Sequence, residues 1–477
     1  MNLIDTLKKE TYPSKDYIFK DLNISGKSIN LVFNEVLTNT EIIDHFIIKE
    51  LIGRSKKDLK NLINILPNTN ILEINDYEIL DFINNGFLVI IGYNIIAIEV
   101  RAYLDRGIAE VKSELSIIGP KDAFSEMYNI NLGLIRRRIK SPDLVNDTMM
   151  IGRSTKTQIG ILYMNNIVNK DLVKNIKDKI NKIDIDGIID SSYLKHSLEH
   201  KNNLFPTLCT TERPDKSAMA LLEGKVAILV DGSPYTIILP SFFIDFFHTV
   251  DDYYGKDINT TFIRIIRLIA FLIAIFLPAL YISVTTRNYS IIPMKLLIML
   301  KAGRSFVPFP AYIEALFMII AFEILKESDI RMSANTGTAV SILGGLILGD
   351  AAVSAGIVSP IMIIIIAISS IAGLIFQSFE LVNATRYYKI FLLILSALFG
   401  IYGVIVGAII LIYNLLSIKC FNYSYLTPFI PFDKNEILDS FIKKDKIIKT
   451  RNSKLTNNIV RGKYQWKKTF YYYYFLY

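Results

Sequence analysis

One apolar run limits the folds open to this chain more than any other feature of its sequence. FIRIIRLIAFLIAIFLPALYISV, residues 262–284, exceeds the roughly 20 residues of helix that cross the hydrocarbon core of a membrane. Further apolar segments follow it, at 307–325, 335–360, 361–379 and 387–417. Charged residues instead concentrate before 260 and after 432. This pattern predicts an all-α, polytopic membrane domain at 256–418.

The basic residues after the apolar block predict its orientation. Eleven Lys and Arg lie between Lys434 and Lys468, and the positive-inside rule places this tail, residues 419–477, in the cytosol. The first residues contain no signal-peptide core, so the first 250 residues are also expected there. Both ends on one side require an even number of crossings. Four true spans with irregular pieces are the preferred count, and the long segment 387–417 either tilts strongly or bends at Gly400, Gly403 or Gly407.

The half of the chain before the apolar block contains an internal repeat. INLVFNEVLTNTEIIDHFIIKELI from Ile29 aligns without gaps with IGILYMNNIVNKDLVKNIKDKINKI from Ile159. Each copy predicts a buried strand, an Asn at a helix N-cap (Asn39 and Asn169) and an amphipathic helix. Two apolar runs around a turn follow later in each copy. The repeat predicts two α/β units with mixed sheets, at 1–105 and 155–255, joined by a helical connector at 106–154.

The connector carries a dense basic cluster, LIRRRIK at 134–140. Arg136, Arg137 and Arg138 are expected in the last turn of a helix, where cations interact favourably with the helix macrodipole. A net charge of +8 fits the excess of Lys and Arg on cytosolic segments of membrane proteins, and no nucleic-acid-reading module accompanies it. We therefore predict no nucleic-acid partner. The arginines are expected to organise the junction between the two units or the contact between neighbouring subunits.

Catalytic and metal-binding patterns are weak. HSLEH at 196–200 matches the H-x-x-E-H arrangement of some zinc proteases, but its segment is polar and no third ligand is evident, so a solvated helix face is the preferred interpretation. Two distant cysteines, Cys209 and Cys420, supply neither a disulfide framework nor a zinc site. No phosphate-binding loop, nucleophile elbow or dinucleotide fingerprint occurs. The sequence predicts a protein without enzymatic activity, cofactor or metal.

The stretch FPTLCTTERPDKSAMALLEGK contains a second charged cluster. Glu212, Arg213 and Asp215 flank Pro214 at an expected helix start, where charge pairing is favourable. Arg213 can bridge carboxylates in bidentate fashion, and a similar network could include Arg136 to Arg138. A structural salt network is preferred over a ligand site here.

The apolar block contains ionisable and small residues that are unusual at membrane depth. Acids there are costly unless they pair or face water. Small side chains either permit close helix packing or leave room for a narrow lumen between several copies. Both alternatives remain open, and the candidates for pore lining or coupling are Glu314, Glu323, Ser341, Gly344, Gly345, Gly349, Asp350 and Val353.

Several stretches together resemble a known family. GPKDAFSEMYNINLGLIRRRIK, FPTLCTTERPDKSAMALLEGKVAILVDGSP, HTVDDYY, VPFPAYIEAL and SYLTPFIPF are similar to the bacterial spore germination receptor A-subunit family, the GerA type. The resemblance implies two thioredoxin-like subdomains before the membrane domain. They lack a C-x-x-C pair, so redox chemistry is not expected.

The resemblance also implies a function. It suggests a subunit of a nutrient germinant receptor that forms an oligomeric, nutrient-gated cation channel in the inner spore membrane. Expected partners are further copies of the chain, a transporter-like B subunit, a lipoprotein C subunit and membrane lipid. The alternative is a non-conducting scaffold or accessory subunit, of the receptor or of the dipicolinate-release machinery.

Overall fold

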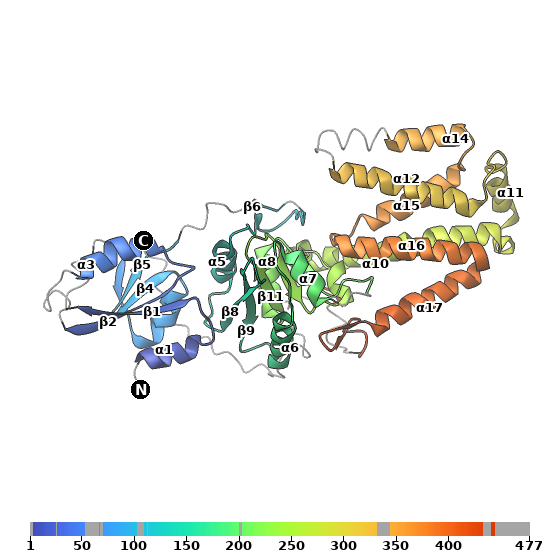
Figure 1. The fold of residues 1–477 in the computed structure, drawn as a ribbon. Helices are drawn as coiled ribbons and strands as arrows, with labels where there is room; N and C mark the ends of the chain where they lie inside the picture. The colour runs from blue at the N-terminus through green and yellow to red at the C-terminus, as the bar shows by residue number, and fades with distance from the viewer. Residues whose placement is uncertain are drawn as a thin grey trace.

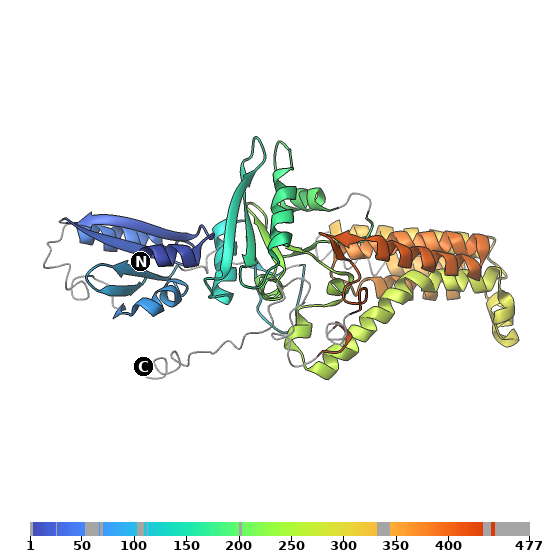
Figure 2. The ribbon, with the colours of Figure 1, turned by 90° about the horizontal axis from the view of Figure 1, so that it is seen from below.

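Three parts follow one another along the chain and in space (Figure 1). The computed structural model describes residues 3–24, 26–52, 66, 70–102, 109–111, 113–199, 203–331, 344–432 and 440–443. Two units built on β-sheets come first, and a bundle of helices comes last. The view from below shows the same row, with the second unit between the first unit and the bundle (Figure 2).

The first unit is a five-stranded sheet with helices packed on it. Its strand order is β1-β2-β4-β5-β3, and every pair is antiparallel. The side chains of Leu31 and Val32 enter separate apolar clusters because alternate residues of a strand point to opposite faces. The elements are α1 (Leu3–Thr11), β1 (Tyr17–Ile24), β2 (Lys27–Asn34), α2 (Thr40–Ile42), a π-helix (Ile43–Ile48), α3 (Lys49–Ile52), β3 (Ile71–Glu73), α4 (Ile79–Ile83), β4 (Phe87–Ile91) and β5 (Ile95–Glu99).

The second unit has the same arrangement of strands. Its order, β8-β9-β11-β12-β10, is that of the first sheet strand for strand, and its pairs are also antiparallel. The prediction of mixed sheets was therefore wrong. The elements are α5 (Tyr128–Arg138), β8 (Leu144–Ile151), β9 (Thr157–Met164), α6 (Lys170–Asn181), α7 (Ser191–Leu198), β10 (Cys209–Thr211), α8 (Pro214–Leu222), β11 (Val226–Val230) and β12 (Thr236–Leu239).

The aligned repeat occupies equivalent places in the two units. Ile29 and Ile159 are both buried, in β2 and β9 respectively. Asn39 and Asn169 both cap the helix that follows, each with a side-chain oxygen that accepts a backbone N–H. The pattern of buried strand and capped helix therefore forms in both copies.

The boundaries of the predicted connector need correction. β8 lies inside the predicted helical connector, yet it pairs with β9 along its whole length, from Leu144 opposite Met164 to Ile151 opposite Thr157. The second sheet thus begins at Leu144 rather than at 155. The connector also contributes two short strands, β6 (Ala109–Glu110) and β7 (Asp122–Ala123), which pair with each other.

The bundle begins with the longest helix of the described chain, α10 (Asp257–Thr286), which packs on α15 and α16. α10 and α16 are long and apolar enough to cross a membrane, whereas α15, α17 and the helical stretch 344–354 are apolar but shorter. The further helices are α9 (Asp251–Tyr254), α11 (Met294–Ala302), α12 (Ala311–Arg331), a π-turn (Ile347–Ala351), α14 (Ala352–Ser354), α15 (Pro360–Gly373), α16 (Phe379–Phe399) and α17 (Ile401–Ser417).

The segment 387–417 bends at Gly400, one of the two alternatives left open by the sequence. Gly400 adopts a positive φ of 63°, and a Cβ there would lie 2.4 Å from the Asn288 side chain. The Asn288 oxygen accepts the N–H of Ile401 at 3.0 Å. The chain therefore reverses, and α17 runs back along α16.

The chain leaves the bundle at the end where it entered. After α17, β13 (Lys419–Cys420) and β14 (Tyr423–Ser424) form a small hairpin against the second unit. The Phe243 N–H donates to the Tyr425 carbonyl at 3.0 Å, and the Cys420 thiol donates to the Thr207 carbonyl at 3.1 Å. Residues 418–432 and the second unit thus lie on the same side of the bundle. Most of the predicted basic tail lies outside the described residues.

Candidate functional site

A buried ion pair joins the two α/β units. Arg136, at the end of α5, donates to both carboxylate oxygens of Asp16 at 2.8 and 2.9 Å, and to Ser14 Oγ at 3.0 Å. Arg136 is 1% exposed and Asp16 4%. Its guanidinium also stacks over the ring of Tyr17, the first residue of β1, and burial raises the pKa of that phenol to about 12. Arg136 therefore lies at the junction between the units, one of the two places predicted for it.

The other two arginines of the cluster differ in position. Arg138 donates to both oxygens of Asp122 at 2.7 Å and to the Leu134 carbonyl at 3.0 Å, so it ties α5 to β7. Arg137 is exposed. Each arginine thus has its own surroundings, although the sequence presents them as one block.

Arg213 is the centre of a second buried cluster. Its guanidinium binds Asp215 in bidentate fashion at 3.1 and 2.9 Å. Its remaining N–H groups donate to Ser116 Oγ at 2.7 Å, the Pro120 carbonyl at 2.9 Å and the Glu114 carbonyl at 3.3 Å. All five N–H donors of this side chain are used, which is how a buried arginine avoids the cost of unpaired polar groups.

The Arg213 cluster holds the connector against the second unit. Glu212 accepts the N–H groups of Ser113 and Glu114 at 2.5 and 2.8 Å. Glu114 in turn accepts from Lys216 at 2.7 Å. Arg136 and Arg138 form similar ion pairs apart from this cluster, with Asp16 and Asp122 respectively.

A third buried cluster, which was not predicted from the sequence, lies where the second unit meets the bundle. Asp252 accepts from Arg267 at 2.7 Å and from Arg264 at 3.4 Å, and all three side chains are under 10% exposed. Burial disfavours the charged carboxylate, but the hydrogen bond and charge of Arg267 and the charge of Arg264 outweigh it and lower the pKa of Asp252. Two arginines three residues apart in the apolar run were the available signal, because they occupy one helix face.

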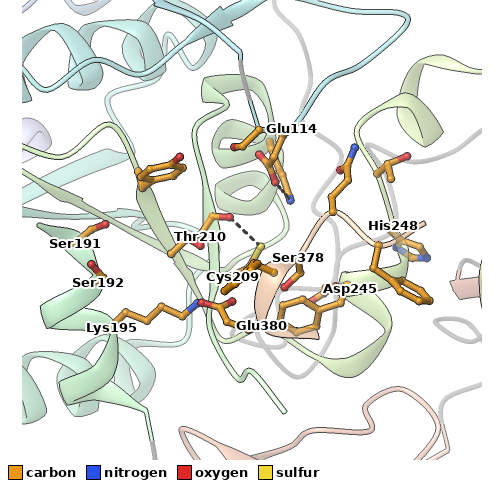
Figure 3. A pocket seen from close by; sticks show the side chains of 18 of the residues that line it. Glu114, Ser191, Ser192, Lys195, Cys209, Thr210, Asp245, His248, Ser378 and Glu380 are labelled. Carbon is orange, nitrogen blue, oxygen red and sulfur yellow. Dashed lines mark hydrogen bonds and ion pairs between the residues drawn. The ribbon is translucent and has the colours of Figure 1, made fainter. Parts of the chain in front are cut away.

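A cavity of about 320 Å³ lies between the second unit and the turn that joins α15 to α16. Figure 3 shows Lys195 of α7 reaching Glu380 of α16 on one side of it, with His248 on the other. Lys195 is 2% exposed and forms an ion pair with Glu380. The cavity therefore lies between groups that connect the soluble part of the chain to the bundle.

Burial controls the ionisation of several groups around this cavity. It lowers the pKa of His248 to about 4, helped by the positive charge of Arg264, while Nε2 lies 2.9 Å from the Ser440 carbonyl. Burial also raises the pKa of the Cys209 thiol, which lines the cavity, and it raises the pKa of Cys420, outside the lining, to about 12. His248 is accordingly neutral at physiological pH, and both thiols are protonated and poor nucleophiles.

The H-x-x-E-H pattern does not form a zinc site among the described residues. α7 ends at Leu198, so the helix does not continue through Glu199. The Glu199 carboxylate instead accepts the N–H groups of Thr207 and Leu208, both at 3.0 Å. His200 lies outside the described residues. In the part of the chain that the structure describes, no group of three His, Cys, Asp or Glu side chains could hold a metal ion.

Two of the predicted intramembrane acids form ion pairs within the chain. Glu314, 1% exposed, accepts from Arg304 at 2.8 Å and from the N–H and Oγ of Ser359 at 3.1 and 3.0 Å. Glu323 lies 2.8 Å from Arg386. Glu314 is thus buried and paired within the chain, and its role in a pore lining or a coupling pair stays a prediction. The pairing also gives a structural reason for an arginine at position 304, in the segment between α11 and α12.

The glycines in the described part of the predicted small-residue segment differ in what surrounds them. A Cβ on Gly345 or Gly349 would meet no described atom within 4 Å, whereas one on Gly344 would lie 2.5 Å from Leu325 of α12. Asp350 is exposed and Val353 is half-buried. Ser341 lies outside the described residues. Of these three glycines, Gly344 alone lies close to another described helix.

Known proteins resemble this chain over most of its length. The family model described as Bacillus/Clostridium GerA spore germination protein matches residues 5–454. Spore germination protein KA of Bacillus subtilis (strain 168) is 41% identical over 339 residues, which are 71% of this chain and 62% of that protein. Spore germination protein GerQA of Bacillus cereus is 34% identical, covering 93% and 89% of the two chains. Spore germination protein B1 of Bacillus subtilis (strain 168) is 30% identical, covering 93% and 94%.

One solved structure also resembles part of the chain. The N-terminal domain of the A subunit of the Bacillus megaterium spore germinant receptor GerK3 is 27% identical, with a TM-score of 0.37, and the match covers 50% of this chain and 94% of that one. The family model and the three relatives agree with the resemblance drawn from the motifs. The chain belongs to the Bacillus/Clostridium GerA spore germination protein family.

Proposed function

We propose that this chain is the A-type subunit of a spore germinant receptor and forms an oligomeric, nutrient-gated cation channel in the inner spore membrane. In this proposal the bundle is a multi-pass membrane domain, and the soluble units and the C-terminal tail are cytosolic. A transporter-like B subunit and a lipoprotein C subunit complete the receptor. The chain has no catalytic role.

The observation that carries the channel proposal is that Gly345 and Gly349, in the helical stretch 344–354, meet no described atom within 4 Å. A glycine inside a helix lowers the stability of the helix, so its presence is normally explained by close packing or by a special backbone conformation. Gly345 and Gly349 have no described neighbour to pack against. Copies of the chain arranged around a closed symmetry axis would bring these segments together, where small residues leave a narrow path and the exposed Asp350 would favour cations.

Gating requires a connection between the soluble units and the bundle. The Lys195–Glu380 pair and the pairing of Asp252 with Arg267 both cross this boundary. Buried ion pairs resist small distortions because breaking one leaves an uncompensated charge. A displacement of the second unit, triggered by a partner subunit, would therefore move the starts of α10 and α16 and rearrange the bundle.

The proposal is tested by measuring ion conduction of the assembled receptor after bulky substitutions at Gly345 and Gly349. We expect Gly345→Trp and Gly349→Trp to abolish or strongly reduce germinant-triggered release of monovalent cations from spores. Ile364→Trp is the matched control, since Ile364 is 55% exposed on α15, away from the proposed path. Unchanged release in both glycine variants, with normal protein levels, would exclude this stretch as the pore.

A non-conducting scaffold or accessory subunit, of the receptor or of the dipicolinate-release machinery, is the competing function. It is favoured by the internal neutralisation of Glu314 by Arg304, because a sealed acid contributes nothing to conduction. Oligomeric order separates the two. A ring of identical copies in native-membrane mass spectrometry supports the channel, and a single copy bound to other subunits supports the scaffold.

A further inference from the structure

The loop of residues 113–120, here called the connector loop, is fixed from its inner side by polar groups of the second unit. Glu212 accepts two of its N–H groups, and Arg213 donates to Ser116 and to the Pro120 carbonyl. These anchors are themselves buried, with Glu212 6% and Arg213 1% exposed. The inner side of the loop is therefore a built polar interface and not a chance contact.

The tip of the loop is held in the same way by elements at the end of the bundle. Asp251 of α9 accepts the N–H groups of Ile117 and Ile118 at 3.0 and 3.1 Å. Gln377, in the turn between α15 and α16, donates to the Leu115 carbonyl at 3.3 Å. The loop thus bridges the start of α10 and the α15–α16 turn.

The large apolar side chains of this well-anchored loop point into solvent, whereas an ordinary surface loop exposes mainly polar side chains. Leu115 is 70% exposed, Ile117 94% and Ile118 54%. A single exposed apolar residue needs no explanation, but a group of three on a rigid polar support marks an interaction surface. Solvent alone gives no reason for fixing apolar side chains outward.

The apolar tip lies beside the place where the exposed apolar surface of the bundle begins. α10 starts six residues after the Asp251 anchor, and its first exposed apolar side chains are Ile258, 84% exposed, and Phe262, 64% exposed. Exposed lysines, Lys121 and Lys256, flank the two elements. Apolar tips beside basic residues are typical of segments that lie in the headgroup region of an anionic membrane.

We propose that the connector loop is a membrane-interface anchor, in which Leu115, Ile117 and Ile118 insert at the boundary between lipid headgroups and acyl chains. The inference rests on the proposed membrane location of the bundle. The anchor fixes the height of the second unit against the bilayer. Motion of that unit is then confined to the membrane plane, where it displaces the starts of α10 and α16 and not the whole soluble part.

Tryptophan fluorescence with lipid quenchers tests the anchor. The sequence has a single tryptophan, Trp466, so Trp466→Phe supplies a background for one reporter at a time. The full chain is reconstituted in vesicles of phosphatidylcholine and phosphatidylglycerol with bromine near the top of the acyl chains. The reporters are Ile117→Trp in the loop, Ile269→Trp on the exposed face of α10 and Phe46→Trp on the first unit, where the native side chains are 94%, 50% and 56% exposed.

The anchor predicts a loss of Ile117→Trp emission comparable with that of Ile269→Trp, and no loss for Phe46→Trp. Quenching of Ile269→Trp without quenching of Ile117→Trp overturns the anchor and leaves the proposed membrane domain intact. Absence of quenching at both positions overturns both. Blue-shifted but unquenched emission from Ile117→Trp indicates that a second copy or another protein covers the loop, and quenching of Phe46→Trp indicates non-specific adsorption; either result also overturns the anchor.

Discussion

The two α/β units have the same strand order, but the core of the first is confined to that unit, whereas the core of the second is continuous with the bundle. The core of the first unit consists of two clusters, one on each face of its sheet, and both draw only on residues of that unit. The main cluster of the second unit instead continues from Ile161 of β9 into Phe271 and Ile275 of α10 and Leu392 of α16. One topology thus serves as a self-contained unit in the first case and as the base of the helical bundle in the second.

This difference teaches where mechanical coupling lies in the molecule. The buried pair of Arg136 with Asp16 joins the first unit to the second. Continuous apolar packing joins the second unit to the bundle, together with the Asp252 and Lys195 ion pairs. Because packed interiors transmit displacement, the second unit is expected to move with the bundle, while the first unit is attached at fewer points.

The largest effect is expected at Arg213. Arg213→Met leaves Asp215 and three connector acceptors without their donor, and breaking a buried pair of this kind costs about 3 to 5 kcal/mol. Equilibrium urea unfolding of the full chain in detergent measures the loss. Arg153→Met is the matched control, since Arg153 pairs with Asp184 at the surface and should leave stability unchanged. Equal stability of the two variants would show that the buried Arg213 cluster contributes no more to stability than an exposed ion pair.

Loss of Arg136 should act on the first unit specifically. Arg136→Met leaves Asp16 buried without its partner, and we expect a cost of about 3 kcal/mol, with faster hydrogen exchange in β1 but not in β11. The double variant Arg136→Met with Asp16→Leu removes both charges and should recover much of the loss. Equal acceleration in β1 and β11 would contradict separate attachment of the two units.

Acid should weaken the contact between the second unit and the bundle through His248. Burial and Arg264 keep its pKa at about 4, below the ordinary 6.5, so between these values the unfolded chain binds a proton that the folded chain does not. The neutral ring therefore contributes fully to the free energy of unfolding above pH 6.5, and this contribution is lost as the pH falls from 6.5 to about 4. We expect a loss of about 2 kcal/mol, discounted because the ring is partly solvated. His248→Gln should flatten the pH dependence of urea unfolding between pH 7 and 4.

The smallest loss of stability is expected from substitution of the two equivalent N-cap residues, Asn39 and Asn169. Asn39→Ala removes acceptance from Glu41 and Ile42 and should cost about 1 kcal/mol. Asn169→Ala removes a similar cap and also the bond of its amide to the Tyr423 hydroxyl, 3.2 Å away in the segment that returns from the bundle. We expect about 1 kcal/mol more for Asn169→Ala, and Tyr423→Phe should abolish this excess. Identical costs in urea unfolding would show that the returning segment contributes nothing to the second unit.

Local patterns predicted much of the fold, and particular residues show why. Ile29 and Ile159 identified equivalent strands, and Asn39 and Asn169 identified the helix starts, because burial and capping depend on residues close in sequence. The reversal at Gly400 was one of two readings of an overlong apolar segment. Strand β8 was missed because its place beside β9 is set by pairing, and strand propensity alone is a weak signal.

The sequence predicted some of the residues at the buried charged clusters, but not their partners. Arg136 was assigned to the junction between the units or between subunits, but Asp16, more than a hundred residues away, could not be named as its partner. Glu314 was offered for a pore lining or a coupling pair, but its contacts with Arg304 and Ser359 could not be named from the sequence. Asp252 and the cavity near His248 were not predicted, since they form only where the second unit meets the bundle.

Composition and periodicity by themselves determined that this chain has a repeated α/β half, an apolar helical half and a basic tail, because these properties depend on the order of residues along the chain. The tertiary structure decided which charges form pairs, which glycines pack against another described helix and which apolar residues stay exposed. These outcomes depend on contacts between segments far apart in sequence. Electrostatic and packing energies are set by such contacts, so residues of identical type, such as Arg136 and Arg137, can be buried in one case and exposed in the other.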